Sequence, residues 1–338
     1  MGDPMELPDV RVARYRFALE PLDTILLPPY KGSALRGGFG HALKRLVCYH
    51  SHGVCRECGL GNDCVYGYLF ETAPPDDTEV LSTNEAVPRP FVIQPPRDRR
   101  GRYEPGQELA FHLVLIGHGV AYLPYFVLGF QELGKAGLGG WVEMPEGRRR
   151  GTYRLREVQV LHPLDGKSEP IYDGETLVDT DLDVGAAQIA AWAKGLPADR
   201  LMVEFVTPAR LKHAGRYARD TVDFHVLVRV LLRRLSSLAY FHCGAQWETD
   251  YRGWVERAQR VRVAESHLSW MDWGRRSGRQ KRRIDMGGVV GSLTYEGDLA
   301  DFRPLLALGA LVHVGKGTVF GNGQYRLAAN HRSNDRAR

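Results

Sequence analysis

The chain has 338 residues, which is enough for two domains of ordinary size. Hydrophobic residues make up 43% and charged residues 25%, which excludes an intrinsically disordered chain because enough apolar surface is present to form cores. No apolar run reaches the roughly 18 residues that a membrane-spanning helix needs, and the acidic, proline-containing N-terminus is unlike a signal peptide. We therefore expect a cytoplasmic protein with no membrane partner.

The formal net charge is +5 and the sequence pI is about 8.9, which favours a polyanionic partner. The basic residues are also clustered, at Arg97–Arg102, at Arg148–Arg150 and most densely at Arg275–Arg283. A single run of this kind is typical of a solvated loop. Three runs, together with a glycine-rich loop, favour a nucleic acid as the partner.

The first half of the chain predicts the order strand, helix, insertion, strand, helix, strand. Residues 11–20 alternate polar and apolar, Leu26–Tyr30 is a proline-containing turn, and Ser33 is the expected N-cap of a helix that runs to about Val47. The remaining elements predicted in this half are a long insertion at about 48–106, a strand at Leu109–Ile116, a helix at Tyr122–Leu133 and a strand at Tyr153–Leu161.

A polar segment, roughly 162–198, joins the two halves and includes a short predicted helix near Ala186–Ala193. The second half then predicts strands at Leu201–Thr207, His267–Trp273, Val289–Tyr295 and Tyr325–Leu327, and helices at Val222–Tyr240, Val255–Arg262 and Leu299–Leu308. The last ten residues are predicted to be disordered.

The two halves repeat one order of elements, which is typical of the split βαβ pattern of ferredoxin-like domains. The predicted fold class is therefore α+β, with two tandem ferredoxin-like (RRM-like) domains and a Cys-rich, zinc-binding-like insertion in the first. The predicted divisions are an N-terminal domain at 10–165 with its insertion at about 48–106, a linker at 166–198, a C-terminal domain at 199–328 and a tail at 329–338.

Four of the five cysteines are gathered as Cys48-x6-Cys55-x2-Cys58-x5-Cys64. Four thiolates this close can form a tetrahedral site, and Cys-x2-Cys is a usual element of zinc sites. An iron–sulfur cluster also takes four cysteines and stays as the alternative. Because four thiolates leave no open coordination position, we expect structural zinc that stabilises the insertion and no catalytic metal.

The segment GKGTVFGNG carries glycines at 315, 317, 321 and 323. Glycines let the backbone approach a phosphate closely and point N–H groups at it, and Lys316 adds a positive charge. A dinucleotide-binding motif requires a following helix, and a P-loop requires G-x-x-x-x-G-K-[S/T]; neither is present. We expect contact with an RNA backbone, with tight packing against a sheet as the alternative.

His41 lies on the predicted first helix, whose apolar positions include Leu35, Phe39 and Leu46. At about 100° per residue, His41 falls about 140° away from that stripe, on a basic face with Lys44 and Arg45 on either side. An imidazole on such a face can act as a general acid or base near neutral pH. His213, beside Lys212, is the reserve candidate, whereas His225 and His242 lie on or near an apolar helix and are expected to be structural.

Four segments together resemble the CRISPR pre-crRNA processing endoribonucleases of the RAMP superfamily. They are YKGSALRGGFGHALKRL, CYHSHGVCRECGLGNDCVYGYLFE, FVTPARLKHAGR and LVHVGKGTVFGNGQYRL, and the likeness extends over roughly residues 11–328. The resemblance implies two ferredoxin-like domains side by side that bind CRISPR repeat RNA and cut it once within each repeat. It also implies cleavage without metal, by attack of the 2′-hydroxyl on the adjacent phosphate, leaving a 2′,3′-cyclic phosphate and a 5′-hydroxyl.

The resemblance further implies a catalytic histidine with tyrosine or lysine helpers, for which His41, Tyr30 and Lys44 are the matching candidates. The residues expected to contact RNA are Lys31, Arg36, Arg45, Lys212, Arg275, Arg276, Arg279, Lys281, Arg282, Gly315, Lys316, Gly317, Gly321 and Gly323. Trp270, Trp273 and Tyr295, which lie near the basic run at Arg275–Arg283 in the sequence, are candidates for stacking on RNA bases.

Two other functions remain open from sequence. The first is a non-catalytic RAMP subunit that binds crRNA within a CRISPR effector complex, in which case other effector subunits are its partners. The second is a zinc-stabilised DNA-binding protein, which is disfavoured because no recognition-helix signature is present.

Overall fold

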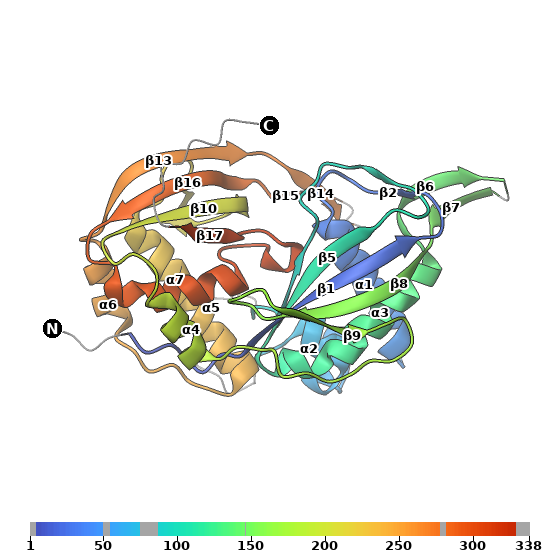
Figure 1. Ribbon diagram of the computed structural model, residues 1–338, viewed down its shortest axis with the longest axis horizontal. Coiled ribbons are helices and arrows are strands. Elements are labelled where there is room, and N and C mark those ends of the chain that lie inside the picture. The colour runs from blue at the N-terminus through green and yellow to red at the C-terminus, as the bar shows by residue number, and fades with distance from the viewer. Residues whose placement is uncertain (1–4, 50–54, 75–86, 146, 278–281, 329–338) are drawn as a thin grey trace.

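The computed structural model describes residues 5–49, 55–74, 87–145, 147–277 and 282–328 (Figure 1). In the N-terminal half the helices are α1 (Gly32–Val47), α2 (Val65–Glu71) and α3 (Leu123–Ala136). The strands are β1 (Val12–Pro21), β2 (Ile25–Leu26), β3 (Phe91–Gln94), β4 (Arg102–Tyr103), β5 (Leu109–Ile116), β6 (Leu138–Met144), β7 (Gly147–Gly151), β8 (Tyr153–Leu161) and β9 (Ser168–Tyr172).

The main sheet of this half has the strand order β3-β5-β1-β8-β9, and its neighbouring strands are antiparallel. Taken along the chain, β1, α1, β3, β5, α3 and β8 form the ferredoxin-like βαββαβ unit. Alternation along β1 decides which side chains are buried: Tyr15 and Phe17 pack with α1 and α3, whereas Arg14 and Arg16 lie on the opposite face. In Figure 1 this opposite face of β5, β1 and β8 is turned toward the viewer.

The predicted insertion at 48–106 is wrong in one respect. Its residues Phe91–Gln94 form β3, which pairs with β5 and supplies the second strand of the ferredoxin-like unit. All four residues of β3 are buried, so no polar–apolar alternation marks it in the sequence. Because β3 has only four residues and is followed by two prolines, its sequence resembles a loop.

The C-terminal half repeats the same unit. Its helices are α5 (Phe224–Cys243), α6 (Tyr251–Ala258) and α7 (Arg303–Val312), and its strands are β10 (Arg200–Ala209), β11 (Lys212–His213), β12 (Arg216–Tyr217), β13 (Arg262–Met271), β14 (Gly274–Ser277), β15 (Arg282–Asp285), β16 (Gly288–Glu296) and β17 (Tyr325–Ala328). The sheet order β13-β16-β10-β17 matches β3-β5-β1-β8 position by position. The α+β class with tandem ferredoxin-like folds is therefore confirmed.

The segment predicted as a linker, 166–198, is folded against both halves. It contains β9, which extends the first sheet, and α4 (Ala186–Ala193), which packs against α7 of the second half. An isolated bridge between Val12 and Val184 ties the same segment to β1. The predicted tail at 329–338 lies outside the described residues.

The two halves share a hydrophobic boundary. Val12, Val114 and Ile116 of the first sheet belong to the same buried cluster as α5 and α7 of the second half. His242 of α5 also crosses this boundary: its Nε2 donates to the Pro88 carbonyl at 2.6 Å, and its Nδ1 accepts from the Tyr68 hydroxyl at 3.1 Å. His242 is fully buried, as expected for a structural histidine.

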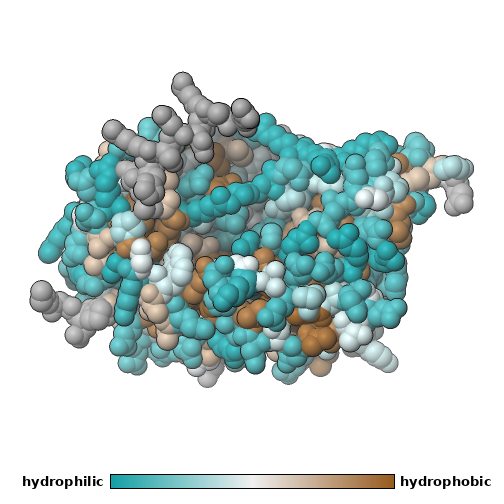
Figure 2. All heavy atoms as spheres, in the orientation of Figure 1, coloured by the Kyte–Doolittle hydropathy of each residue, from teal (hydrophilic) through white to brown (hydrophobic). Residues whose placement is uncertain are grey.

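The surface on view in Figure 2 is mostly hydrophilic, with hydrophobic residues gathered in separate small patches. Among the described helices, none combines the length and the hydrophobicity that crossing a membrane requires.

Candidate active site and nucleic-acid interface

His41 lies on the exposed side of α1. The helix buries Leu35, Phe39, Ala42 and Leu43 against the sheet and α3, and this stripe leaves His41 facing solvent. The helix begins at Gly32 with Lys31 as its N-cap, so the predicted N-cap Ser33 is wrong by two positions. The histidine is therefore available to a ligand.

A pocket of about 360 Å³ opens beside His41. His41 and Arg45, one helical turn apart on α1, line one side, and Arg150 of β7 lines the other. The remaining lining is Gly38, Leu133, Ala136 and Gly137, so the pocket combines a histidine and two guanidinium groups with an apolar floor and contains no carboxylate.

Two glycines shape this pocket. A Cβ on Gly38 would come within 2.9 Å of the Leu133 side chain, so the glycine allows α1 and α3 to approach closely. Gly137 follows α3 with φ of +86°, and a Cβ there would lie 2.7 Å from Cβ of Arg150. Because Gly137 has no side chain, Arg150 can pack against the C-terminal end of α3.

The predicted helpers of His41 lie elsewhere. Neither Tyr30 nor Lys44 lines the pocket. Lys44 Nζ stands over the Tyr66 ring of α2, 5.6 Å from its centroid. Tyr30 precedes α1, and its ring lies 4.2 Å from that of Trp273 in the second half. Burial raises the pKa of the Tyr30 hydroxyl, which disfavours a phenolate at this position.

Lys31 is a correction to the predicted RNA contacts. Its side chain is 0% exposed, donates to the Asp98 carbonyl at 2.6 Å and forms an ion pair with the Asp98 carboxylate at 3.3 Å. A buried lysine needs such a partner because an isolated buried charge is strongly destabilising. Lys31 therefore holds the 98–103 segment against the start of α1 and does not face a ligand.

The glycine-rich loop between α7 and β17 is closely packed. Gly315, Gly317, Gly321 and Gly323 all have positive φ, between +70° and +89°. A Cβ on Gly323 would stand 1.8 Å from the Val314 carbonyl oxygen. These glycines are therefore required by the shape of the loop itself.

The same loop joins the two halves. A Cβ on Gly321 would lie 2.7 Å from the Ile93 carbonyl oxygen of β3, and one on Gly32 would lie 2.0 Å from the Phe320 carbonyl oxygen. Arg36 of α1 lies over Phe70 and Phe320, with its guanidinium 4.5 Å and 5.4 Å from the two ring centroids. Arg36 is thus packed at this junction, while Lys316 is exposed.

Two family models match this chain. One, whose description reads only N-terminal domain, matches residues 7–183, and the other, CRISPR-associated endoribonuclease Cas6, matches residues 203–325. The C-terminal part of the chain, residues 203–325, is therefore similar to the Cas6 endoribonucleases.

The proteins that are similar to this chain differ widely from it in sequence. A protein of Archaeoglobus fulgidus, described as uncharacterized, is 27% identical over 312 residues, which is 89% of this chain and 92% of that protein. A Cas6 product complex has a TM-score of 0.52 at 19% identity and covers 96% of this chain and 100% of its own. A partial Cas6-RT-Cas1–Cas2 complex has a TM-score of 0.56 at 15% identity. The match covers 98% of this chain but only 48% of the chain in that complex.

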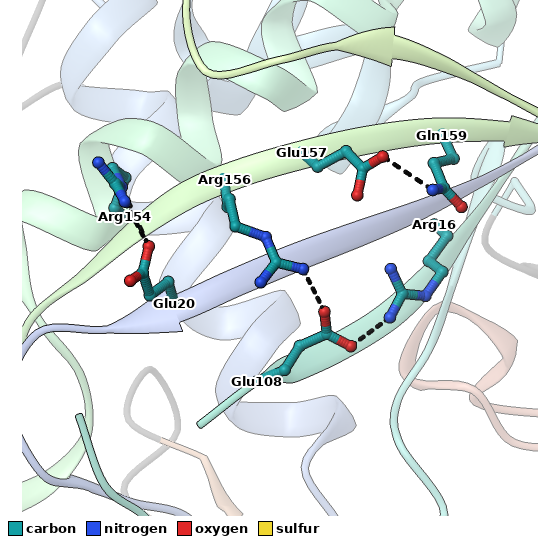
Figure 3. A network of polar contacts seen from close by, with 7 residues as sticks. All are labelled: Arg16, Glu20, Glu108, Arg154, Arg156, Glu157 and Gln159. Atoms are coloured by element: carbon teal, nitrogen blue, oxygen red, sulfur yellow. Dashed lines mark hydrogen bonds and ion pairs between the residues drawn. The ribbon is translucent and has the colours of Figure 1, made fainter. Parts of the chain in front are cut away.

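On the outer face of the first sheet, most of the arginine charge is neutralised by carboxylates. Glu108 accepts from Arg16 and from Arg156, and Glu20 pairs with Arg154 at 2.6 Å (Figure 3). Gln159 donates to Glu157 on the same face. This part of the sheet therefore carries arginines whose charge is already matched.

Arg14, two residues before Arg16 on β1, is different. Its Nε is buried without a hydrogen-bond partner in the described structure, and burial, followed by Arg326 and Arg97, lowers the pKa of its guanidinium. Burial and the guanidinium groups around it also lower the pKa of His112 to about 4. Positive charge thus accumulates here without a counter-charge.

Arg14 lines a cavity of about 310 Å³ between the two ferredoxin-like units. Gln94 and Arg14 line it from the first sheet, and Arg326 and Gln324 line it from the C-terminal end of the chain. The sequence did not indicate this cavity, because Arg14 and Arg326 are far apart along the chain. The alternation of β1 was the available signal, since it places Arg14 and Arg16 on one face.

The described ends of the basic run at 275–283 lie on β14 and β15, which pair antiparallel with Arg275 opposite Ile284 and Arg276 opposite Arg283. The side chains of Arg275, Arg276 and Arg282, and the whole of Arg279 and Lys281, lie outside the described residues. Lys212 and His213 are exposed on β11, and the His213 ring lies 5.2 Å from that of His225.

Of the residues suggested for base stacking, Tyr295 is fully buried and donates to the Val222 carbonyl at 2.9 Å, so it is a core residue. Trp270 stacks with Arg219, whose guanidinium is 4.6 Å from its ring.

The four clustered cysteines are partly buried. Within the ranges that the structure describes, no three Cys, His, Asp or Glu side chains come together as metal ligands. His50 and His52, which lie in the same segment, are outside those ranges. The described residues therefore do not form the predicted metal site, and zinc binding stays a prediction from the cysteine spacing.

Proposed function

We propose that this chain binds CRISPR repeat RNA and cleaves it within the repeat, with no metal ion in the reaction. The observation that carries the proposal is His41, exposed on the wall of a pocket that also contains Arg45 and Arg150. A pocket with this composition suits an anionic substrate that undergoes proton transfer. It lacks the several acidic ligands that two-metal hydrolysis requires.

In the proposed reaction, the 2′-hydroxyl of the nucleotide before the cut attacks the adjacent phosphorus. The bond from phosphorus to the 5′-oxygen breaks, which leaves a 2′,3′-cyclic phosphate on one product and a 5′-hydroxyl on the other. One proton leaves the 2′-hydroxyl and one is gained by the 5′-oxygen. His41 performs one of these transfers, because an imidazole exchanges protons near neutral pH.

Arg45 and Arg150 have a distinct role in this proposal. The transition state carries more negative charge on the phosphate oxygens than the substrate does. Guanidinium groups stay protonated throughout and present paired N–H donors to phosphate. Fixed donors of this kind stabilise developing charge without having to reorganise.

The remainder of the repeat has a second basic surface available. Arg14 and Arg326 line the cavity between the ferredoxin-like units, and Arg14 has no carboxylate partner among the described residues, so an RNA phosphate there would supply a counter-charge. We propose that this cavity and the exposed Lys316 contribute affinity, while the His41 pocket performs the cut. Other CRISPR proteins are proposed partners, since a complex of similar fold joins Cas6 to Cas1 and Cas2.

The test is cleavage of labelled repeat RNA in excess EDTA by the wild-type chain and by His41→Ala. A second substrate carries a 2′-deoxy sugar at the cut site. We expect wild type to cut only the ribose substrate and His41→Ala to lose most of that activity. Binding without cleavage by the wild type would instead identify a subunit that holds crRNA. Full activity in His41→Ala would move the active site, with His213 tested next.

A further inference from the structure

The β6–β7 hairpin carries a group that the proposed reaction does not yet use, Trp141. Trp141 on β6 is paired across the hairpin with Arg150 on β7. The indole is 54% exposed, which is unusual for so large an apolar side chain, and the Arg150 guanidinium lies 5.6 Å from its ring centroid. An exposed indole beside an arginine is the combination that single-stranded nucleic acids bind by stacking.

The three arginines of this hairpin differ in their partners. Arg149 pairs with Asp23 at 2.9 Å, and Arg148 lies 3.6 Å from Glu143. Arg150 has no carboxylate partner among the described residues, and it is also the arginine that lines the His41 pocket. Its charge is therefore available to an anion bound there.

The base of the hairpin is held rigidly. A Cβ on Gly139 would stand 2.1 Å from the Leu26 carbonyl oxygen, and one on Gly151 would stand 2.1 Å from the Thr24 carbonyl oxygen. Gly137 brings the end of α3 against Arg150 in the same way. Because the backbone is packed this closely, the backbone of the hairpin at Trp141 and Arg150 is held against β2 and the end of α3 before any ligand binds.

We propose that Arg150 and Trp141 form a nucleotide subsite next to His41, in which Arg150 binds the phosphate at the cut and Trp141 stacks on a neighbouring base. The inference rests on the proposed function, since it assigns RNA to the His41 pocket. The apolar floor formed by Leu133 and Ala136 suits the sugar that links the phosphate to the base. In this proposal the β6–β7 hairpin forms one wall of the active site.

The experiment compares Arg150→Ala, Arg150→Lys, Trp141→Ala and Trp141→Phe with Arg148→Ala as the matched control. Arg148 is exposed on the same strand and loses the same charge, but it lies outside the pocket. Affinity for repeat RNA and the single-turnover cleavage rate at saturating protein are measured for each. Circular dichroism and thermal unfolding confirm that each variant is folded.

We expect Arg150→Ala to slow the cleavage step by roughly 100-fold, which is typical for the loss of one preorganised donor to a developing anion. Arg150→Lys recovers part of this rate because it keeps the charge without the paired donors. Trp141→Ala weakens binding by about tenfold, whereas Trp141→Phe retains most of the affinity. Arg148→Ala changes both quantities by less than about threefold, consistent with a screened exposed charge.

The outcomes separate this inference from the proposed function. If wild type cleaves and the Arg150 and Trp141 variants match Arg148→Ala, the subsite is wrong while the enzyme stands. If wild type binds without cleaving, the enzyme is wrong, and affinity alone decides the subsite: weaker binding by Trp141→Ala and Arg150→Ala than by Arg148→Ala supports it. If wild type does not bind repeat RNA, both are overturned.

Discussion

The side-chain amide of Gln94 donates a hydrogen bond to Nε2 of His313 over 2.8 Å, and the two residues belong to different ferredoxin-like units. His313 Nδ1 in turn donates to the Asn322 carbonyl of the glycine-rich loop at 3.0 Å. A carbonyl only accepts, so Nδ1 carries the proton and Nε2 is the acceptor. His313 has φ of +65°, uncommon for a residue with a Cβ, and it is fully buried. The neutral form of His313 therefore links the glycine-rich loop to Gln94 of β3 by two hydrogen bonds.

The first prediction concerns pH and His313. Burial lowers the pKa of His313 from 6.5 to about 3. Below pH 6.5 His313 is protonated in the unfolded chain, whereas in the folded chain it stays neutral until the pH falls to about 3. The stabilisation is therefore complete above pH 6.5 and is lost as the pH falls toward 3, by up to about 1.4 kcal/mol per pH unit.

His313→Gln removes this titration. Between pH 7 and pH 5, the variant should lose about 2 kcal/mol less free energy of unfolding than wild type does, measured by urea denaturation at each pH. Burial also lowers the pKa of His242 to about 4, so that residue contributes in the same direction in both proteins. Parallel pH profiles for the two proteins would contradict the prediction.

The second prediction uses two glycines of α1. Gly32→Ala places a Cβ 2.0 Å from the Phe320 carbonyl oxygen, so it should destabilise the chain by about 1–3 kcal/mol. Gly37→Ala meets nothing within 4 Å and lies in the middle of the same helix, so it should stabilise by about 0.5–1 kcal/mol. Thermal and urea unfolding measure both. Equal effects from the two changes would show that the loop does not pack on α1 as described.

The third prediction separates two lysines that sequence analysis assigned to the same role. Lys31→Met should lower the free energy of unfolding by about 1–3 kcal/mol, because it leaves the Pro29 and Asp98 carbonyls without the donor that Lys31 supplies. RNA affinity per folded molecule should be unchanged. Lys316→Met, on an exposed side chain, should leave stability unchanged, weaken RNA binding and reduce the salt dependence of affinity by about one ion. Weaker RNA binding by folded Lys31→Met would return that residue to the interface.

The fourth prediction compares two arginines on one face of β1. Arg14 lacks a counter-charge in the described structure, whereas Arg16 is paired with Glu108. Arg14→Gln should weaken RNA binding and reduce its salt dependence by about one ion, and it should not lower the stability of the chain. Arg16→Gln should have the smaller effect on affinity, because its charge is already matched. The reverse order of affinities would place the RNA on another surface.

The fifth prediction concerns the cysteines. If zinc is bound, purified protein should carry about one zinc per chain by elemental analysis, and Cys55→Ser with Cys58→Ser should abolish it. A chelator should then lower the melting temperature of wild type but not of the double variant. Wild-type protein isolated without zinc and without iron would end the metal hypothesis for this cluster.

The sequence by itself determined most of the element types, though not β3, and the class of fold. The β1 alternation, the apolar stripe of α1 and the repeated order of elements are local patterns, and each follows from the period of one element. The same periodicity placed His41 away from the core, and the structure confirms its exposure. Glycine spacing marked the loop at 315–323 because positive φ excludes most side chains.

Only the tertiary structure decided which charged residues are free. Lys31 and Arg36 resemble Arg45 in sequence, yet the first is buried against Asp98 and the second is packed on aromatic rings. Arg150 lines the His41 pocket because α1 and α3 approach each other closely. Arg14 lines its cavity because the two ferredoxin-like units meet there. Such pairings depend on long-range contacts, and no local period of the chain encodes them. For that reason sequence reasoning could identify His41 and Arg45, which share one helix, but not Arg150, which lines the pocket from another element.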